Sequence, residues 1–314
     1  HGDGKPLLIL GEDENGAICM AVQMSDIYDS GLFFNEIDAE EYYDLSTPYG
    51  YGGPVCRGEV SDGLKKLYVE KLYDYCRENS IVSLFFRFHP MIGNQDVLSK
   101  FQSTLKLKQT VYISTDAEEE IFKNMNTKTR NMVRKAEKNG VFVNFDSGER
   151  IDDFLGVYNE TMTRIAAEKY YFFGSDELHY LIDNMKENVM VAYAKYEGEI
   201  IGSSMFLYDK NGMHYHLSGV KNDFRKLGAN DLILYEAAKK ACSMGLSTLH
   251  LGGGTEPEDS LFSFKKHFNQ NGLKDFYIGR MIFDEEKFDK LVDIRCRTDK
   301  DFDISRPFMI KYRG

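Results

Sequence analysis

The sequence predicts an α+β protein of two tandem domains, each with a mixed, mostly antiparallel sheet flanked by helices. Three observations predict this class. From residue 151 onward, apolar periodicities follow the order ααβββαβαβ. Glu197-Gly198 provides a hairpin turn between two apolar runs. A helix–strand–helix–strand pattern in the first part of the chain recurs about 165 residues later. We therefore expect two copies of one fold rather than one large sheet.

Apolar spacing defines the expected elements of the second half. They are helices at about 151–167 and 175–188, strands at about 189–196, 199–208 and 213–219, a helix at about 231–244, a strand at about 248–252, a short helix at about 259–268 and a strand at about 274–283.

The first half contains fewer legible elements. We expect a strand at about 18–24, the Gly-rich turn YGYGGP, a helix at about 63–79, a strand at about 81–88, a short helix after Gly93 and a strand at about 105–113. Glycines precede each long helix in both halves. The predicted domains are residues 1–120 and 121–284, and residues 285–314 form a C-terminal tail that we expect to pack on the first domain.

Composition excludes several classes of protein. The 314 residues are 42% hydrophobic, which is enough to form buried hydrophobic cores. No apolar run approaches the roughly 20 residues that span a bilayer, so we expect no membrane span. The five cysteines are scattered and lack C-x-x-C spacing, which indicates neither a disulfide framework nor a cysteine zinc site. A reducing cytoplasm fits this cysteine usage best.

The net charge of −11 argues against a protein that wraps a long nucleic acid. The basic residues are nevertheless uneven, because one predicted helix that begins with Glu118 to Glu120 carries Lys123, Lys128, Arg130, Arg134, Lys135 and Lys138. Its acids come first and its bases last, as in a solvated helix that matches its own dipole. The alternative is a ridge that faces phosphates, with Arg130, Arg134 and Lys138 on one side.

Residues 225–269 contain the most informative succession of motifs. Gly228-Ala229 leads into a predicted helix whose first N–H groups are free to bind an anion such as a phosphate or pyrophosphate. A short buried strand follows, and Gly252-Gly253-Gly254 lets the backbone leave it at unusual angles. An ordinary helix–strand connection is the alternative interpretation of the first glycine.

The side chains do not indicate covalent catalysis or a metal. There is no G-x-S-x-G motif, and Cys56 is more typical of a small buried residue than of a nucleophile. His214 and His216 share a face of a predicted strand, but no third ligand lies at legible spacing, so we predict no metal site. Either histidine would be able to accept a proton near neutral pH if it lines a cleft.

Four segments of the second half resemble a known family. They are NTKTRNMVRKAEKNGV (126–141), VYNETMTRIAAEKYYF (157–172), RKLGANDLILYEAAKKACSMG (225–245) and LHLGGG followed by FKKHFN (249–269). Together they resemble the GNAT acyltransferase fold, in its FemABX-like branch of tandem GNAT domains that aminoacylate peptidoglycan precursors. In the first half only STPYGYGGP (46–54) is similar to a loop of these proteins. His250 stands where many relatives have Asp, and R-x-x-G-A-N replaces the fuller R-x-x-G-x-G/A turn.

The resemblance implies the site residues. Phe264 and Lys265 would lie in the reacting region, where the Lys265 ammonium stabilises an oxyanion or holds an acceptor phosphate. Without the resemblance, FKKHF would be a solvated amphipathic helix with its phenylalanines inward. The remaining implied residues are Arg225, Gly228, Ala229 and Asn230 for the donor's phosphates, Tyr215, Arg164 and Tyr171 for the cleft wall, Tyr49 and Tyr51 for the acceptor, and His216 as the proton acceptor.

The resemblance also implies the activity. We expect an acyltransferase that forms an amide on an amine of a cell-envelope precursor, with the acceptor on the first GNAT-like domain and the donor on the second. The donor would be acyl-CoA or aminoacyl-tRNA, with no tightly bound cofactor and no other nucleic acid as partner. An acyl-CoA-dependent N-acetyltransferase of a small metabolite or nucleotide amino sugar is one alternative. A degenerate GNAT protein that binds its ligand without turnover is another.

Overall fold

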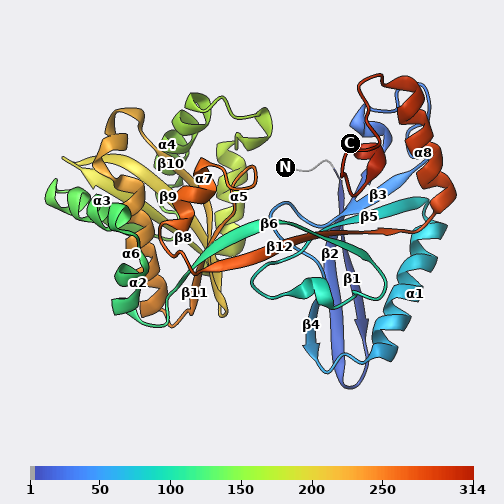
Figure 1. Cartoon of the computed structure of the whole chain (residues 1–314), viewed down its shortest axis with the longest axis horizontal. Coiled ribbons are helices and arrows are strands. Elements are labelled where there is room, and N and C mark those ends of the chain that lie inside the picture. The colour runs from blue at the N-terminus through green and yellow to red at the C-terminus, as the bar shows by residue number, and fades with distance from the viewer. Residues whose placement is uncertain (1–3) are drawn as a thin grey trace. The chain divides into compact units, whose positions relative to one another are not determined.

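The computed structural model describes residues 4–314, which form two compact units (Figure 1). Unit 1 comprises the chain up to Lys108 together with Asp275–Gly314, and unit 2 comprises Gln109–Lys274. The chain leaves unit 1 within β6 (Ser103–Ser114) and returns to it within β12 (Leu273–Ile282). We predicted boundaries after residues 120 and 284, whereas the structure divides the chain inside these two strands.

Unit 1 is a mixed sheet in the order β1-β2-β3-β5-β12, with β4 paired to β2. Only the pair β3/β5 is parallel among these neighbours. The bounds are β1 (Lys5–Glu12), β2 (Gly16–Asp26), β3 (Tyr43–Ser46), β4 (Val55–Gly58), α1 (Asp62–Glu78), β5 (Ile81–Arg87) and α8 (Glu285–Thr298), with single turns η1 (Tyr28–Ser30), η2 (Asn94–Asp96) and η6 (Lys311–Arg313).

Helices cover both faces of the unit 1 sheet. Leu84 and Phe86 of β5 belong to the apolar cluster under α1, whereas Phe85 between them packs on the cluster under α8. Because successive side chains of a strand point to opposite faces, α1 and α8 lie on opposite sides of this sheet. Ser61 starts α1 by accepting a hydrogen bond from the Leu64 N–H at 3.0 Å.

The C-terminal segment closes the α8 side of unit 1. Tyr312 is fully buried, and its hydroxyl lies 2.7 Å from the Ser83 hydroxyl. Arg313 donates two hydrogen bonds of 2.8 Å to the two carboxylate oxygens of Asp44, a bidentate arrangement. Residues 285–314 therefore belong to unit 1, and they contain the helix α8 in addition to the tail that we expected.

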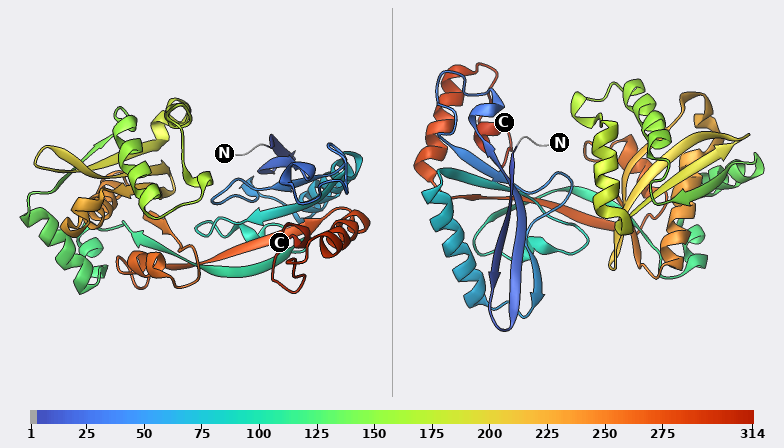
Figure 2. Two further views of the ribbon diagram at one scale, coloured as in Figure 1. Left: turned by 90° about the horizontal axis from the view of Figure 1, so that it is seen from above. Right: turned by 180° about the vertical axis from the view of Figure 1, so that it is seen from behind.

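Unit 2 is a sheet in the order β6-β11-β10-β9-β8-β7 between two layers of helices (Figures 1 and 2). It is antiparallel except for the pair β10/β11. The bounds are α2 (Glu118–Asn124), α3 (Thr127–Lys138), β7 (Phe142–Asp146), α4 (Ile151–Arg164), η3 (Lys169–Tyr171), α5 (Ser175–Met185), η4 (Lys186–Asn188), β8 (Val189–Tyr196), β9 (Glu199–Asp209), β10 (Gly212–Val220), η5 (Asn222–Leu227), α6 (Ala229–Ser243), β11 (Thr248–Gly252) and α7 (Ser260–Lys266).

The apolar side chains of β8 alternate between the two helix layers. Val189, Val191 and Tyr193 join the cluster under α4 and α5, whereas Met190 and Ala192 join the cluster of α2, α3, α6 and α7. The sequence predicted a mixed, mostly antiparallel sheet flanked by helices, and this prediction is confirmed.

The same succession of elements occurs in both units. In unit 1, β2 pairs antiparallel with β3, and β3 pairs parallel with β5, to which α1 connects it. In unit 2, β9 pairs antiparallel with β10, and β10 pairs parallel with β11, to which α6 connects it. α1 and α6 begin 167 residues apart, at Asp62 and Ala229, and so do β5 and β11, at Ile81 and Thr248. The antiparallel neighbour of β5 is β12, and that of β11 is β6.

Several elements differ from the sequence prediction. The basic helix that we expected to begin with Glu118 is two helices, because Asn126 has an extended backbone and caps α3 by accepting a hydrogen bond from the Thr129 N–H at 2.8 Å. The strands β1, β3, β4 and β7 and the helix α8 were not predicted. Among residues 4–314, no helix is long and apolar enough to cross a membrane.

Candidate functional site

The parallel pairing of β10 and β11 ends after two registered positions, Met213 with Leu249 and His214 with His250. Both strands are irregular immediately beyond this point, β10 between Tyr215 and Leu217 and β11 between His250 and Gly252. Within the described residues, the rest of β10 keeps only β9 as a strand partner. We call residues 215–220 of β10 the open edge.

A side chain of α4 occupies the end of the open edge. The Thr161 hydroxyl accepts a hydrogen bond from the Val220 N–H at 2.9 Å and lies 3.1 Å from the Val220 carbonyl oxygen. It satisfies backbone groups that a neighbouring strand would otherwise bind. The backbone groups at this end of the open edge therefore have hydrogen-bond partners without a further strand.

Lys265 of α7 lies beside the open edge. Asp259 caps the start of α7, because its carboxylate accepts a hydrogen bond from the Phe262 N–H at 2.7 Å. Lys265 follows three residues after the buried Phe262 and shares its face. Its side chain is only 8% exposed, and its Nζ donates to the Gly253 carbonyl at 2.7 Å, 5.9 Å from the Tyr215 ring centre. A solvated surface helix therefore does not describe this lysine.

Tyr215 belongs to a polar network that connects β10 to the start of α6. Its hydroxyl donates to the Asn230 Oδ1 at 3.2 Å, and the Ser218 hydroxyl donates to the same oxygen at 3.2 Å. Ser204 of β9 lies 2.8 Å from the Ser218 hydroxyl. Burial raises the pKa of Tyr215 more than these hydrogen bonds lower it. Tyr215 is therefore a neutral phenol at physiological pH.

Three histidines lie on the same part of β10 and β11. The Nδ1 atoms of His214 and His250 are 3.1 Å apart, and the His216 ring centre lies 6.3 Å from that of His214. Desolvation by the surrounding atoms lowers the pKa of His216 to about 4, although the residue is exposed on the strand. His216 is thus neutral at pH 7 and able to accept a proton. Among residues 4–314, no group of three or more His, Cys, Asp or Glu side chains is arranged to hold a metal ion.

The start of α6 combines a glycine with an acid. Gly228 precedes the helix with φ +77°, and a Cβ added there would lie 2.9 Å from the Met132 carbonyl oxygen of α3. Only glycine fits this position without strain. In the first turn, burial raises the pKa of Asp231 to about 6, while Lys128 of α3 lowers it to a smaller extent. The Asp231 backbone N–H also lowers this pKa, but burial has the larger effect.

The other predicted residues lie in several places. Phe264 packs on Phe268 with ring centres 5.4 Å apart, Ala229 is buried at the start of α6, and Arg225 is exposed in η5. The Arg164 Nε atom on α4 is buried and has no hydrogen-bond partner among residues 4–314. Tyr171 ends η3 and accepts a hydrogen bond from Tyr158 at its backbone oxygen.

Tyr49 and Tyr51 lie in the loop before β4 of unit 1. Tyr49 is 60% exposed, and the Tyr51 ring packs on Phe276 and His89, with ring centres 5.4 Å and 5.6 Å away. Cys56, which we expected to be buried, is exposed on β4. Its pKa is raised, chiefly by desolvation, so its thiol is a poor nucleophile.

Sequence reasoning missed Thr161, Ser204 and Ser218. Each is a hydroxyl residue, and Ser204 lies in the apolar run IIGSSMFLY, which contains two adjacent serines at fully buried positions. Buried hydroxyl groups need partners, so polar residues inside an apolar strand were the signal for this network.

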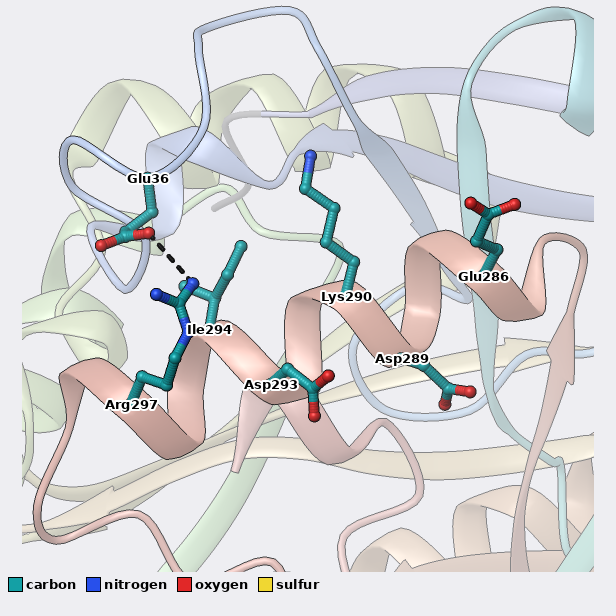
Figure 3. A pocket seen from close by; sticks show the side chains of 7 residues that line it. All are labelled: Glu36, Glu286, Asp289, Lys290, Asp293, Ile294 and Arg297. Atoms are coloured by element: carbon teal, nitrogen blue, oxygen red, sulfur yellow. Dashed lines mark hydrogen bonds and ion pairs between the residues drawn. The ribbon is translucent and has the colours of Figure 1, made fainter.

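Figure 3 shows a hollow on α8 that contains none of the predicted site residues. It is lined by Glu36, Glu286, Asp289, Lys290, Asp293, Ile294 and Arg297. Arg297 and Glu36 form an exposed ion pair of 3.4 Å, and Lys290 donates to the Tyr42 hydroxyl at 2.8 Å. Its cations already have partners within unit 1.

Comparisons with known proteins agree with the geometry of unit 2. Residues 123–266 match the family model described as an acetyltransferase (GNAT) domain. The crystal structure of FemX covers 91% of this chain and 90% of its own, with a TM-score of 0.65 and 12% identity. The structure of L-PGS from Bacillus licheniformis covers 92% of this chain and 88% of its own, with a TM-score of 0.58 and 13% identity. A search of curated protein sequences finds no match.

These matches define the class of the protein, an acyltransferase with a GNAT domain. Residues 123–266 match the acetyltransferase (GNAT) domain family, and the chain as a whole has the fold of FemX and L-PGS. The resemblance to FemABX-like GNAT proteins, which the sequence predicted, is thus confirmed at the level of the fold.

Proposed function

We propose that this protein transfers an acyl or aminoacyl group to an amine of a cell-envelope precursor of the peptidoglycan type. The observation that carries the proposal is Lys265, a buried lysine whose Nζ lies at the Gly253 carbonyl, next to Tyr215 and the open edge of β10. The likeness to FemX and L-PGS supports a cell-envelope acceptor.

The reaction needs no covalent enzyme intermediate. The acceptor nitrogen attacks the carbonyl carbon of the donor's ester or thioester, and negative charge develops on the carbonyl oxygen. The Lys265 ammonium and the Tyr215 phenol would stabilise that charge in a largely buried site. Collapse of the tetrahedral intermediate breaks the carbon–oxygen or carbon–sulfur bond. His216, which is neutral at pH 7, would accept the amine proton, and the leaving group is protonated in turn.

Two observations favour a donor carried by RNA over free acyl-CoA. The Asp231 carboxyl at the start of α6 would oppose the pyrophosphate of CoA when ionised. The exposed Lys128, Arg134, Lys135 and Lys138 of α3 form no ion pair among the described residues, which would suit a phosphate backbone. Acyl-CoA remains the alternative donor, because Gly228 to Asn230 still present a helix start.

The experiment compares donors by product mass. The purified protein is incubated with aminoacyl-tRNA or acetyl-CoA and with soluble peptidoglycan-precursor peptides that carry a free amine. An added aminoacyl residue and an added acetyl group differ in mass, so mass spectrometry identifies the donor. The proposal fails if neither donor yields a product. It also fails if Lys265→Ala and Gly228→Pro variants both keep full activity.

A further inference from the structure

Arg87 ends β5 in unit 1 and lies among aromatic side chains. Its guanidinium carbon is 5.4 Å from the ring centre of Tyr49 and 5.6 Å from that of Phe85. Cations within about 6 Å of an aromatic ring centre are attracted to the ring face. Both rings therefore help to hold the half-buried guanidinium in one orientation.

Arg87 has no counter-ion in the described chain. Among residues 4–314, no ion pair or hydrogen bond joins its guanidinium to another residue. Other arginines of unit 1 have such acceptors: Arg313 binds Asp44, Arg77 the Phe283 carbonyl and Arg280 the Met309 carbonyl. The loop Ser46–Pro54 beside Arg87 contains no charged residue. The five N–H donors of Arg87 therefore remain for an acceptor outside the chain.

The backbone around Arg87 is fixed by this loop. The Arg87 N–H donates to the Thr47 Oγ1 at 2.9 Å, and the Arg87 carbonyl accepts from the Gly52 N–H at 2.7 Å. Asn94, which is 3% exposed, donates to the carbonyl oxygens of Gly52 at 2.7 Å and Pro54 at 3.1 Å. A cation held in this way loses little conformational freedom when it binds a ligand.

We propose that Arg87, with Tyr49 beside it, binds an anionic group of the acceptor, a carboxylate or a phosphate. A guanidinium presents paired N–H groups that match both anions in a bidentate manner. Tyr49 would cover the apolar or planar part of the ligand next to the anion. The assignment of the ligand to the acceptor rests on the proposed function, whereas the anion site itself is a property of unit 1.

The test measures anion binding without a donor and without turnover. The probes are inorganic pyrophosphate and N-acetylalanine, followed by NMR of the arginine Nε–H resonances of the full chain. We expect one resonance to shift saturably with an affinity on the order of 1 mM, and at least tenfold weaker binding in Arg87→Gln. Arg87→Lys keeps the charge without the planar fork and should lie between the two. Binding of only one probe identifies the phosphate or the carboxylate as the ligand group.

Arg77→Gln is the matched control. Arg77 also lies near a ring, 5.6 Å from the centre of Tyr73, but its Nε donates to the Phe283 carbonyl at 3.0 Å, so its removal should leave anion binding unchanged. Tyr49→Leu should weaken binding severalfold while the charge remains. The proposal is overturned if the unaltered protein binds neither probe saturably, or if Arg87→Gln binds as well as the unaltered protein. Failed acyl transfer with intact Arg87-dependent binding would sink the proposed function alone.

Discussion

The two units share one arrangement of strands but differ at the point where their parallel strand pair ends. In unit 1, the pair β3/β5 has four registered positions and is then continued by the loop, through hydrogen bonds of Thr47 and Gly52 with Arg87 and a bridge between Gly52 and Phe88. In unit 2, the pair β10/β11 has only two registered positions, and β10 continues as an open edge.

The two units thus share one strand topology, but a loop continues the parallel pair in unit 1, which we call the closed end, whereas β10 has an open edge in unit 2. The closed end in unit 1 presents a fixed cation, Arg87, and aromatic rings, which suit binding. The open edge in unit 2 places Tyr215, Asn230 and Lys265 together, which suits chemistry on a carbonyl group. We therefore propose that unit 2 carries out the transfer and unit 1 the recognition of the acceptor, and each prediction below tests one side of this proposal.

The largest expected effect is on unit 2 and comes from Lys265→Met. This change removes the ammonium beside Tyr215 while keeping an unbranched side chain of similar length. We expect the rate of transfer to fall by about 10²–10³-fold, the usual effect of losing one oxyanion donor. The measurement is kcat/KM for amide formation with whichever donor proves active.

The neighbouring Lys266 provides the control for this prediction. It is half-buried, and its Nζ lies 5.9 Å from the Phe262 ring rather than near Tyr215. Lys266→Met should change kcat/KM less than threefold. Equal losses in both variants would mean that α7 contributes general charge or stability and that Lys265 has no special part in transfer.

The next effect is on unit 1 and comes from Asn94→Ala. Asn94 is buried, donates to the Gly52 and Pro54 carbonyls and accepts from the His89 N–H at 2.8 Å. Its removal leaves these groups without their partner, so the free energy of unfolding should fall by about 2–4 kcal/mol. Urea denaturation measures this change, and hydrogen exchange should show faster opening of residues 46–54.

Asn79→Ala is the comparison for Asn94. Asn79 also donates from its side chain to a backbone carbonyl, that of Tyr75 at 2.8 Å, but it is exposed at the end of α1. Its loss should cost no more than about 1 kcal/mol, because water replaces the bond. If Asn94→Ala costs no more than Asn79→Ala, the loop does not depend on this anchor and the closed end of unit 1 needs another explanation.

The fold was predictable wherever a single element carried a long periodic pattern. α1, α6 and β8 to β11 have apolar residues at helical or alternating spacing over most of their length, and their predicted limits agree with the structure to within two residues. β3 and β4 have four residues each, too few to show a period. The pairing of β6 with β11 and of β12 with β5 was also not predictable, because pairing between distant segments leaves no local signal.

The candidate site was predictable only in part. The Gly loop before α7 and the family resemblance pointed to Lys265, but no local pattern predicts that its Nζ reaches the Gly253 carbonyl. Arg87 was not among the predicted site residues. Its role depends on Tyr49, which lies 38 positions earlier and meets it only because β3 and β5 are neighbours. Contacts of this kind follow from tertiary structure and not from propensity.

A moderate effect is expected at the end of the open edge, from Thr161→Val. Valine preserves the branched shape but removes the hydroxyl that binds the N–H and carbonyl of Val220. The free energy of unfolding should fall by about 1–2 kcal/mol. Thr163→Val on the exposed face of α4 should stay within about 0.5 kcal/mol. Equal values for both variants, measured by urea denaturation, would show that the open edge needs no capping from α4.

The smallest expected effect is on the pH dependence of stability, which should differ between the first turns of α6 and α1. Burial raises the pKa of Asp231 to about 6 from its ordinary 3.8, whereas a hydrogen bond from Lys100 lowers the pKa of the exposed Asp62. Between about pH 4 and 6 the native state holds a proton on Asp231 that the unfolded chain has released. The contribution of Asp231 to stability is therefore lost as the pH rises through this window.

Asp231→Asn removes this titration and should raise the free energy of unfolding at pH 7.5 by on the order of 1–2 kcal/mol, with little change at pH 4. Loss of the favourable interaction of the carboxylate with the start of α6 reduces the gain. Asp62→Asn should have the opposite sign, because a lowered pKa stabilises the native state above pH 4 and this contribution disappears as the pH falls. Denaturation curves at both pH values test the pair. If the two variants respond to pH with the same sign, Asp231 is as well solvated as Asp62, and burial does not raise its pKa.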